Sequence, residues 1–288
     1  MKVVLLWISC ICTIGNCMAQ KFEDQSSFQV DVSQLERFHL YNRRGAVTVK
    51  ATSGQTATLK VTRNLAAQSS SRLEEVKKEV YLDSMRKDGH LVFFIQHPTL
   101  KLKFRDDHTA GYESINQNSW DSNNGKNHVK VQFTITLELP AQTDLTVRNH
   151  EHPLIINGMK GDLKAGNHHD GVVVKNQGGS ADVHSHHGDV EVFYTKNPSR
   201  ECHYDTHHGD IRVHYQKGLS ADASMYSYHG SFYSAFDWSP SPMKVSKQGK
   251  KGAKYRVSSK SETNVKISSG GPAQSFRTHH GDIYLLDQ

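Results

Sequence analysis

The sequence repeats one motif, in which two adjacent histidines precede a glycine and an acidic residue at the head of a short alternating stretch. It stands as SHHGDVEV at 185–192, THHGDIRV at 206–213 and THHGDIYL at 278–285. Neutral imidazole is a good ligand for zinc, copper and nickel, and free histidine titrates at about pH 6.5. The motif therefore points either to a metal site or to a surface that responds to pH.

Stacking of the repeats would bring equivalent histidines close together. Neighbouring strands of a sheet lie about 4.8 Å apart, and a zinc–imidazole bond is about 2.0–2.1 Å long, so two stacked imidazoles are expected to share an ion. No closed ligand spacing such as Cys-x2-Cys or His-Glu-x2-His accompanies them, so histidines inherited by duplication of the repeat are the alternative. The candidate metal ligands are His168, His169, His184, His186, His187, His203, Asp205, His207 and His208.

The same residues support a second interpretation, in which the column responds to pH. Like groups packed together repel one another when charged, and this lowers their pKa. Acidification would then place several positive charges along one edge, which would open the surface or bind anionic glycans.

Aligned on the glycine position of the motif, seven segments share an apolar residue two places after it, and all but 224–234 share another one four places after it. From His150 to Tyr228 the first residue of the doublet recurs at offsets of 18, 18, 21 and 21 residues. Such a period with internal alternation predicts an all-β fold, a β-solenoid or stacked β-roll with polar loop excursions. The segments are 39–49, 146–156, 164–174, 182–192, 203–213, 224–234 and 275–285.

The alternation also assigns faces, because successive strand residues point to opposite sides of a sheet. The predicted interior positions before the turn are Val147, Ala165, Val183, Tyr204, Met225 and Phe276, followed two places on by Asn149, Asn167, Ser185, Thr206, Ser227 and Thr278. The doublets then point outward or lie at the corner, where the glycine allows a tight turn or a close approach of the next repeat.

Catalysis is not expected from these residues. Cys202 is next to His203 and close to Asp205, but the alternation puts the thiol inside, where such groups are usually inert. The aspartate after the glycine recurs in every full motif, as Asp189, Asp210 and Asp282, which indicates a hydrogen bond to backbone amides at the corner. Nucleophile and phosphate-binding motifs are also missing from the sequence.

The first 19 residues combine Lys2, a short apolar run and small residues, which predicts a secretory signal peptide cleaved after Ala19. Acylation of Cys17 is the less favoured alternative, because asparagine is a poor residue before such a cysteine. After cleavage Cys202 is the one remaining cysteine, so no intramolecular disulfide can form. The mature chain has no stretch long enough for a transmembrane helix. The charges of the full chain, +6 in total, are interspersed and argue against nucleic acid as a partner.

The mature chain divides by pattern into an N-terminal β region, 20–140, and a histidine-rich repeat region, 141–288. Polar loops are predicted at 104–127 and 237–254, and one helix at 69–80. The aromatic segment 225–238 is expected to cap the repeats, and a contact surface for a carbohydrate or a protein is the alternative.

The Gly-Asp-Val/Ile strands, the extended strand that ends in LELP, and the closing SSGGPAQSFRTHHGDIYL resemble the putative-adhesin family of exported bacterial β-strand-repeat proteins, a domain of unknown function. The resemblance runs from about Phe28 to Leu286 and implies a solenoid-like, non-enzymatic protein that binds at the cell envelope. A cell-surface glycan or an envelope protein is the expected class of partner. In this family the corner residues of each repeat are usually Ser, Thr or Asn together with Gly. The His-His doublet of this chain departs from that pattern.

Overall fold

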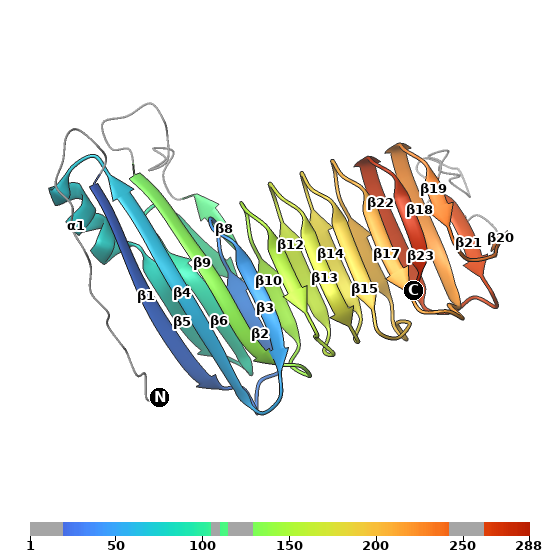
Figure 1. The fold of residues 1–288 in the computed structure, drawn as a ribbon, viewed down its shortest axis with the longest axis horizontal. Helices are drawn as coiled ribbons and strands as arrows, with labels where there is room; N and C mark the ends of the chain where they lie inside the picture. Colours follow the sequence, from blue (N-terminus) through green and yellow to red (C-terminus); the bar gives the residue numbers. More distant parts are fainter. Residues whose placement is uncertain (1–19, 105–109, 115–128, 242–261) are drawn as a thin grey trace, which may run out of the picture. The chain divides into compact units, whose positions relative to one another are not determined.

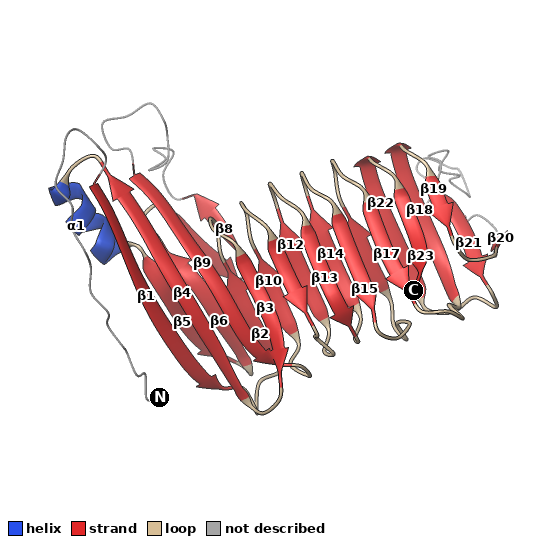
Figure 2. Cartoon of the chain, viewed as in Figure 1, coloured by secondary structure: helices blue, strands red, loops and turns tan. Residues whose placement is uncertain are grey.

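The computed structural model describes residues 20–104, 110–114, 129–241 and 262–288. The predicted signal peptide and parts of both predicted loops lie outside the described residues. The protein is all-β, with one short α-helix among the described elements (Figure 2). It divides into two compact units, 1–161 and 162–288.

The first unit contains long antiparallel strands together with parallel ones. One sheet has the order β1 (Gln20–Asp31), β4 (Thr56–Ala67), β9 (Val129–Pro140), β3 (Val47–Thr52) and β11 (Leu154–Asn157). The other has the order β10 (Leu145–Arg148), β2 (Arg37–Tyr41), β6 (His90–Gln96) and β5 (Tyr81–Lys87), and β7 (Leu100–Phe104) pairs with β8 (Ala110–Ser114).

The helix α1 (Ser70–Glu79) confirms the helical pattern at 69–80. Ser69 caps its first turn by accepting a hydrogen bond from the backbone N–H of Arg72, and Leu73 and Val76 form its buried face. It packs against β4 and β1. In the described part of the chain, no helix is long and apolar enough to cross a bilayer.

The second unit is built mainly from short strands that pair in parallel and in register (Figure 1). The strand at 263–267 is the exception, because it pairs antiparallel with both of its neighbours. We call its two sheets the front and back sheets. The front sheet has the order β12 (Leu163–Asn167), β14 (Ala181–Ser185), β16 (Cys202–Asp205), β22 (Ala273–His280), β18 (Ala221–His229), β21 (Thr263–Ile267) and β20 (Trp238–Pro240). The back sheet has the order β13 (Val172–Gln177), β15 (Val190–Tyr194), β17 (Ile211–Tyr215), β23 (Ile283–Asp287) and β19 (Phe232–Ser234).

The last repeat is inserted between two repeats that precede it in the sequence. Strand β22 lies between β16 and β18, and β23 lies between β17 and β19 (Figure 1). The order of the repeats along the chain is therefore not their order in the sheets. This insertion places the motif at 278–285 directly beside the motif at 206–213.

The predicted interior is confirmed at every position named above. Val183, Tyr204 and Phe276 are at most 1% exposed, and the polar residues two places further on are also buried. The serines and threonines among them donate to corner carbonyls of the adjacent repeat: Thr206 Oγ1 donates to the Gly188 carbonyl at 2.9 Å, and Ser227 Oγ to that of Gly281 at 3.0 Å. Each buried hydroxyl thus ties two repeats together.

The corner glycines are required by close approach. A Cβ on Gly281 would lie 1.9 Å from the carbonyl oxygen of Gly209, which is backbone and cannot move aside. The aspartates beside them confirm the predicted corner bond: Asp189 Oδ1 accepts the N–H of Asp210 at 2.9 Å, and Asp210 Oδ1 accepts that of Asp282 at 2.8 Å. Glycine and aspartate therefore serve the stacking of the repeats.

Two predicted loops contain short strands where the structure describes them, since β8 falls within 104–127 and β20 within 237–254. At the end of the second unit Phe232 and Phe236 are half-buried, as a cap requires, whereas Trp238 is 53% exposed. Cys202 is fully buried, as the alternation predicted.

Candidate functional site: two columns of stacked rings

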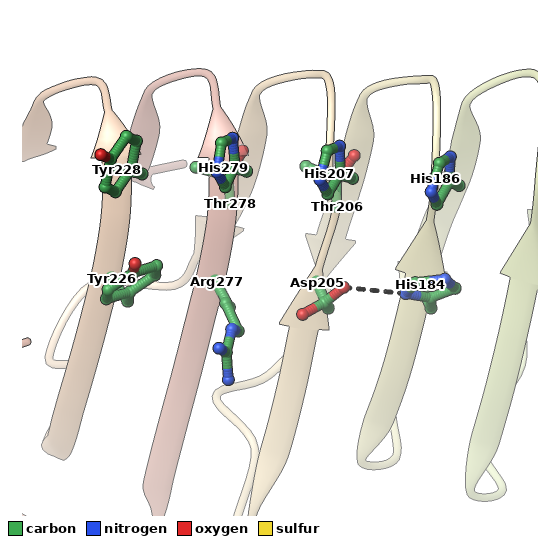
Figure 3. A pocket seen from close by; sticks show the side chains of 10 residues that line it. All are labelled: His184, His186, Asp205, Thr206, His207, Tyr226, Tyr228, Arg277, Thr278 and His279. Atoms are coloured by element: carbon green, nitrogen blue, oxygen red, sulfur yellow. Dashed lines mark hydrogen bonds and ion pairs between the residues drawn. The ribbon is translucent and has the colours of Figure 1, made fainter.

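Five aromatic rings stack along the front sheet, one from each of five adjacent strands or the turns that follow them. We call them the inner column, and four of them are labelled in Figure 3. Successive ring centroids are 4.7, 5.1, 4.8 and 4.9 Å apart, and the ring planes are within 15° of parallel. In spatial order the members are His168, His186, His207, His279 and Tyr228.

The second residue of each doublet forms an outer column beside the first. Its successive centroids are 5.5, 5.1, 4.9 and 4.9 Å apart. The two rings of each doublet meet edge to face, as at His186 and His187, whose centroids are 4.2 Å apart. The outer column consists of His169, His187, His208, His280 and His229.

The columns follow from register. Parallel in-register pairing places equivalent residues of successive repeats directly side by side, at the spacing of neighbouring strands. A residue type that recurs at one position of the repeat therefore becomes a continuous row. The insertion of β22 keeps both rows unbroken, because His279 lies between His207 and Tyr228.

An open groove of about 620 Å³ runs beside the inner column. Its other side is a second row on the same face, formed by His184, Asp205, Arg277 and Tyr226 in cross-strand register (Figure 3). His184 Nδ1 lies 2.9 Å from Asp205 Oδ1, and the Arg277 guanidinium lies 5.2 Å from the centroid of the Tyr226 ring. The groove is thus bordered by aromatic rings, by one guanidinium group and by the Asp205 carboxylate that contacts His184.

The inner imidazoles favour the neutral form. In the described structure Nδ1 of His186, His207 and His279 is buried without a hydrogen-bond partner. A proton there would be a buried, unpaired donor, so Nδ1 keeps its lone pair and the outward Nε2 carries the hydrogen. The column therefore presents a row of N–H donors to solvent.

The surroundings of four of the column imidazoles disfavour their protonated form. Burial lowers the pKa of His168, His186, His208 and His279, and the charges of neighbouring imidazoles add to the effect. The charged form becomes favourable when something negative approaches the rings.

The structure distributes the predicted ligands over three places. His168, His186 and His207 lie in the inner column, whereas His169, His187 and His208 lie in the outer one. His184 and Asp205 pair with each other in the adjoining row. His203 stands apart from these, opposite Asp182 in register and 3.4 Å from Glu201.

Several members of the site were missing from the predicted ligand set. His279 and His280 carry the same motif in the sequence, and Tyr228 and His229 occupy the same positions of their repeat. Their distance along the chain concealed that they continue the columns. Only the strand alternation marked Arg277 and Tyr226 in the sequence, because it places both side chains on the outward face of the sheet.

Two stacked rings of the inner column would have to tilt toward each other to share a metal ion. Two nitrogens on one zinc ion can be at most about 4.2 Å apart, twice the bond length, whereas the stacked rings are parallel and 4.7–5.1 Å apart in the inner column. Among residues 162–241 and 262–288, no three histidine, cysteine or acidic side chains bring ligand atoms within 4.8 Å of one another. Metal binding here would require the rings to rotate, and it stays a prediction.

No protein-family model and no curated protein sequence matches the chain. Three solved structures are similar to it. A "putative cell adhesion protein" of Clostridium sporogenes shows 12% identity over 94% of this chain and 100% of its own, with a TM-score of 0.39. A "putative lipid binding protein" of Parabacteroides distasonis shows 10% identity over 91% and 96%, with a TM-score of 0.33.

The third structure is a "putative adhesin" of Bacteroides fragilis, with 11% identity over 91% of this chain and 97% of its own and a TM-score of 0.23. Two of the three names agree with the adhesin-like resemblance of the sequence. Similarity at this level carries no argument about function, so the function has to be argued from the site.

Proposed function

We propose that this is an exported, non-catalytic, adhesin-like protein that binds a partner at the cell envelope through the ring columns of the second unit. The observation that supports this is the pair of continuous columns, ten rings in all, on an open face of the front sheet. The parallel, in-register repeats supply a rigid support for such a face, and we propose that they form a β-solenoid.

The fold gains little from the histidines themselves, which favours a role in binding. Corner glycines, aspartates and buried hydroxyls already satisfy the turns, as Gly281, Asp210 and Thr206 illustrate. Large aromatic side chains left partly exposed in a regular row are typical of recognition surfaces.

Binding of the mature chain, residues 20–288, to immobilised envelope polysaccharides and envelope proteins tests the proposal. The test variant replaces His186, His207 and His279 by Phe, which keeps ring stacking and removes the Nε2–H donors. The matched control is His203→Gln, an exposed imidazole on the same face outside both columns. Loss of binding in the test variant alone is expected, and equal binding of all three proteins would contradict the proposal.

Export has its own test. The mass of the protein recovered outside the cytoplasm should correspond to a chain that begins at Gln20, after cleavage behind Ala19. A lipid-modified chain beginning at Cys17 would instead favour the lipoprotein alternative.

Metal binding is the second candidate, supported by one contact. A carboxylate that accepts the Nδ1 proton of a histidine is the usual partner of a metal-binding imidazole, and Asp205 occupies this place beside His184. Calorimetric titration of the mature chain with zinc, copper and nickel tests it, with His184→Gln and His203→Gln as the matched pair. Stoichiometric binding lost only in His184→Gln would support a site there.

A further inference from the structure

The direction of the ring nitrogens suggests what kind of ligand the columns take. Because Nδ1 of His186, His207 and His279 is buried, the exposed edge of each ring carries Nε2. The Arg277 guanidinium on the other side of the groove is also a donor without acceptor capacity. Asp205, the acidic residue bordering the groove, is already engaged by His184. The groove therefore favours a ligand rich in acceptors.

The spacing suggests that the ligand is linear and repeating. The inner column runs across five strands at steps of 4.7–5.1 Å, so its rings extend over about 19 Å. A pyranose residue is of similar length to one step. The residues of an extended polyuronate chain therefore keep step with the rings, and the carboxylates on its near side fall at multiples of the ring spacing, whereas the phosphates of polyphosphate follow one another more closely.

We propose that the two columns bind a linear carboxylated polysaccharide laid across the strands, whose carboxylates accept hydrogen bonds from the outward Nε2–H groups. This inference rests on the proposed function, because it names the ligand class of the same face. Neutral imidazoles bind the carboxylates as donors, and protonated ones bind them as cations as well.

Binding and protonation are coupled in this arrangement. The repulsion between neighbouring imidazoles is relieved when carboxylates lie along the rings, so the complex takes up protons and tightens as the pH falls. The charged and titratable groups nearest the columns on the same face are His184, Asp205, Arg277 and Tyr226 in the adjoining row, Lys164, Asp182 and His203 in the row beyond, and Asp170, Asp189, Asp210 and Asp282 at the corners.

The corner aspartates do not cancel the effect. Asp189, Asp210 and Asp282 each hold a backbone N–H of the adjacent repeat through Oδ1. Arg212, on the back sheet, pairs with both Asp189 and Asp210. The charges of Asp189 and Asp210 are thus compensated in part by the Arg212 guanidinium.

The experiment measures binding of the mature chain to polygalacturonate at about pH 5.5 and about pH 7.5. The matched ligand is the fully methyl-esterified polymer, which has the same backbone without charge, and inorganic polyphosphate is the third probe. The proteins are the wild type, the triple variant His186→Phe, His207→Phe and His279→Phe, and the control His203→Gln. Thermal unfolding of each variant establishes that it is folded.

The expected result is binding of polygalacturonate that is about tenfold tighter at the lower pH, at least tenfold weaker in the triple variant, and unchanged in His203→Gln. The methyl ester should not bind. Equal binding of the ester would overturn the ligand class while leaving the proposed binding face intact. Tighter binding of polyphosphate than of polygalacturonate would identify phosphate polymers as the ligand class and overturn the polysaccharide assignment.

Two other outcomes would also overturn the inference. Undiminished binding by a folded triple variant would place the polymer elsewhere on the protein. Failure of all three polymers to bind would exclude the ligand class, and the proposed function would then be judged by its own assay on envelope components.

Discussion

In the first unit His39 is a buried residue with a particular neighbour, and in the second unit histidine is a repeated surface residue. His39 is 2% exposed, and its Nε2 lies 2.9 Å from Nδ1 of His90. The nine imidazoles of the two columns stack on copies of themselves at half-buried or exposed positions. The same side chain is thus part of the core in one unit and part of a surface in the other.

The strands explain this difference. In the first unit β1, β4 and β9 are 12 residues long and pair antiparallel, so most residues meet an unlike partner, as Arg63 meets Asp24 at 2.9 Å. In the second unit short parallel strands in register place like beside like. Repetition therefore turns one residue choice into a row, and the comparison predicts where substitutions are severe and where they are tolerated.

The largest expected effect concerns the close contacts between repeats. Gly281→Ala would bring a Cβ to 1.9 Å from the Gly209 carbonyl oxygen, and it should lower the free energy of unfolding by at least about 3 kcal/mol. Gly218→Ala is the control, since no atom lies within 4 Å of its added Cβ and only its φ of 77° is unfavourable, at about 1 kcal/mol. Denaturant unfolding measures both. Equal losses would show that the repeats do not depend on close approach.

Acidification should separate the two kinds of histidine. In the first unit burial lowers the pKa of His97 to about 4, and the charge of Arg43 adds to the effect. A lowered pKa means that the unfolded chain binds more protons, so this stability is present above the ordinary histidine value of 6.5 and is lost as the pH falls from there to about 4. The loss from His97 amounts to roughly 3 kcal/mol.

Denaturant unfolding between about pH 7.5 and about pH 4 tests this. His97→Leu should remove the part of the pH dependence that comes from the first unit. Replacing His186 and His279 by Phe should remove only the part that comes from these two rings, which also begins near the ordinary histidine value. Identical pH profiles for the wild type and both variants would contradict the assignment of these pKa shifts.

A smaller effect is expected at the buried hydroxyls. Thr206→Val removes the donor to the Gly188 carbonyl and should cost about 1–2 kcal/mol, whereas Thr206→Ser keeps the donor and should cost less. In the first unit a side-chain amide satisfies the equivalent corner carbonyl, since Asn149 Nδ2 donates to the Gly45 carbonyl at 3.0 Å. A Val variant as stable as the Ser variant would show that solvent satisfies the carbonyl instead.

The smallest effect should come from the columns themselves. The triple Phe variant keeps stacked rings and removes Nδ1 atoms that have no hydrogen-bond partner in the described structure, so the midpoint of thermal unfolding near neutral pH should hardly change. His39→Phe in the first unit should lower the midpoint clearly, because it leaves His90 without its 2.9 Å contact. The reverse order would make the columns structural and remove the main argument for a binding role.

Much of the second unit could be predicted because its pattern is local. Alternation assigned Val183, Tyr204 and Phe276 to the interior, and repetition indicated that the glycines and aspartates serve the corners. The helix at 69–80 could be predicted for the same reason, since Ser69, Leu73 and Val76 are close in sequence. Part of the candidate site could also be predicted, because the His-His doublets recur in the sequence at offsets of 18 and 21 residues.

The sequence by itself determined which residues face inward and which recur at each corner, because a strand alternates with a period of two whatever its neighbours are. Only the tertiary structure decided which repeats are neighbours. The last repeat fits beside β16 as well as beside β18, since all repeats share one pattern, and nothing local states that β22 lies between them. The length of the columns and the placing of Arg277 beside the groove follow from that choice.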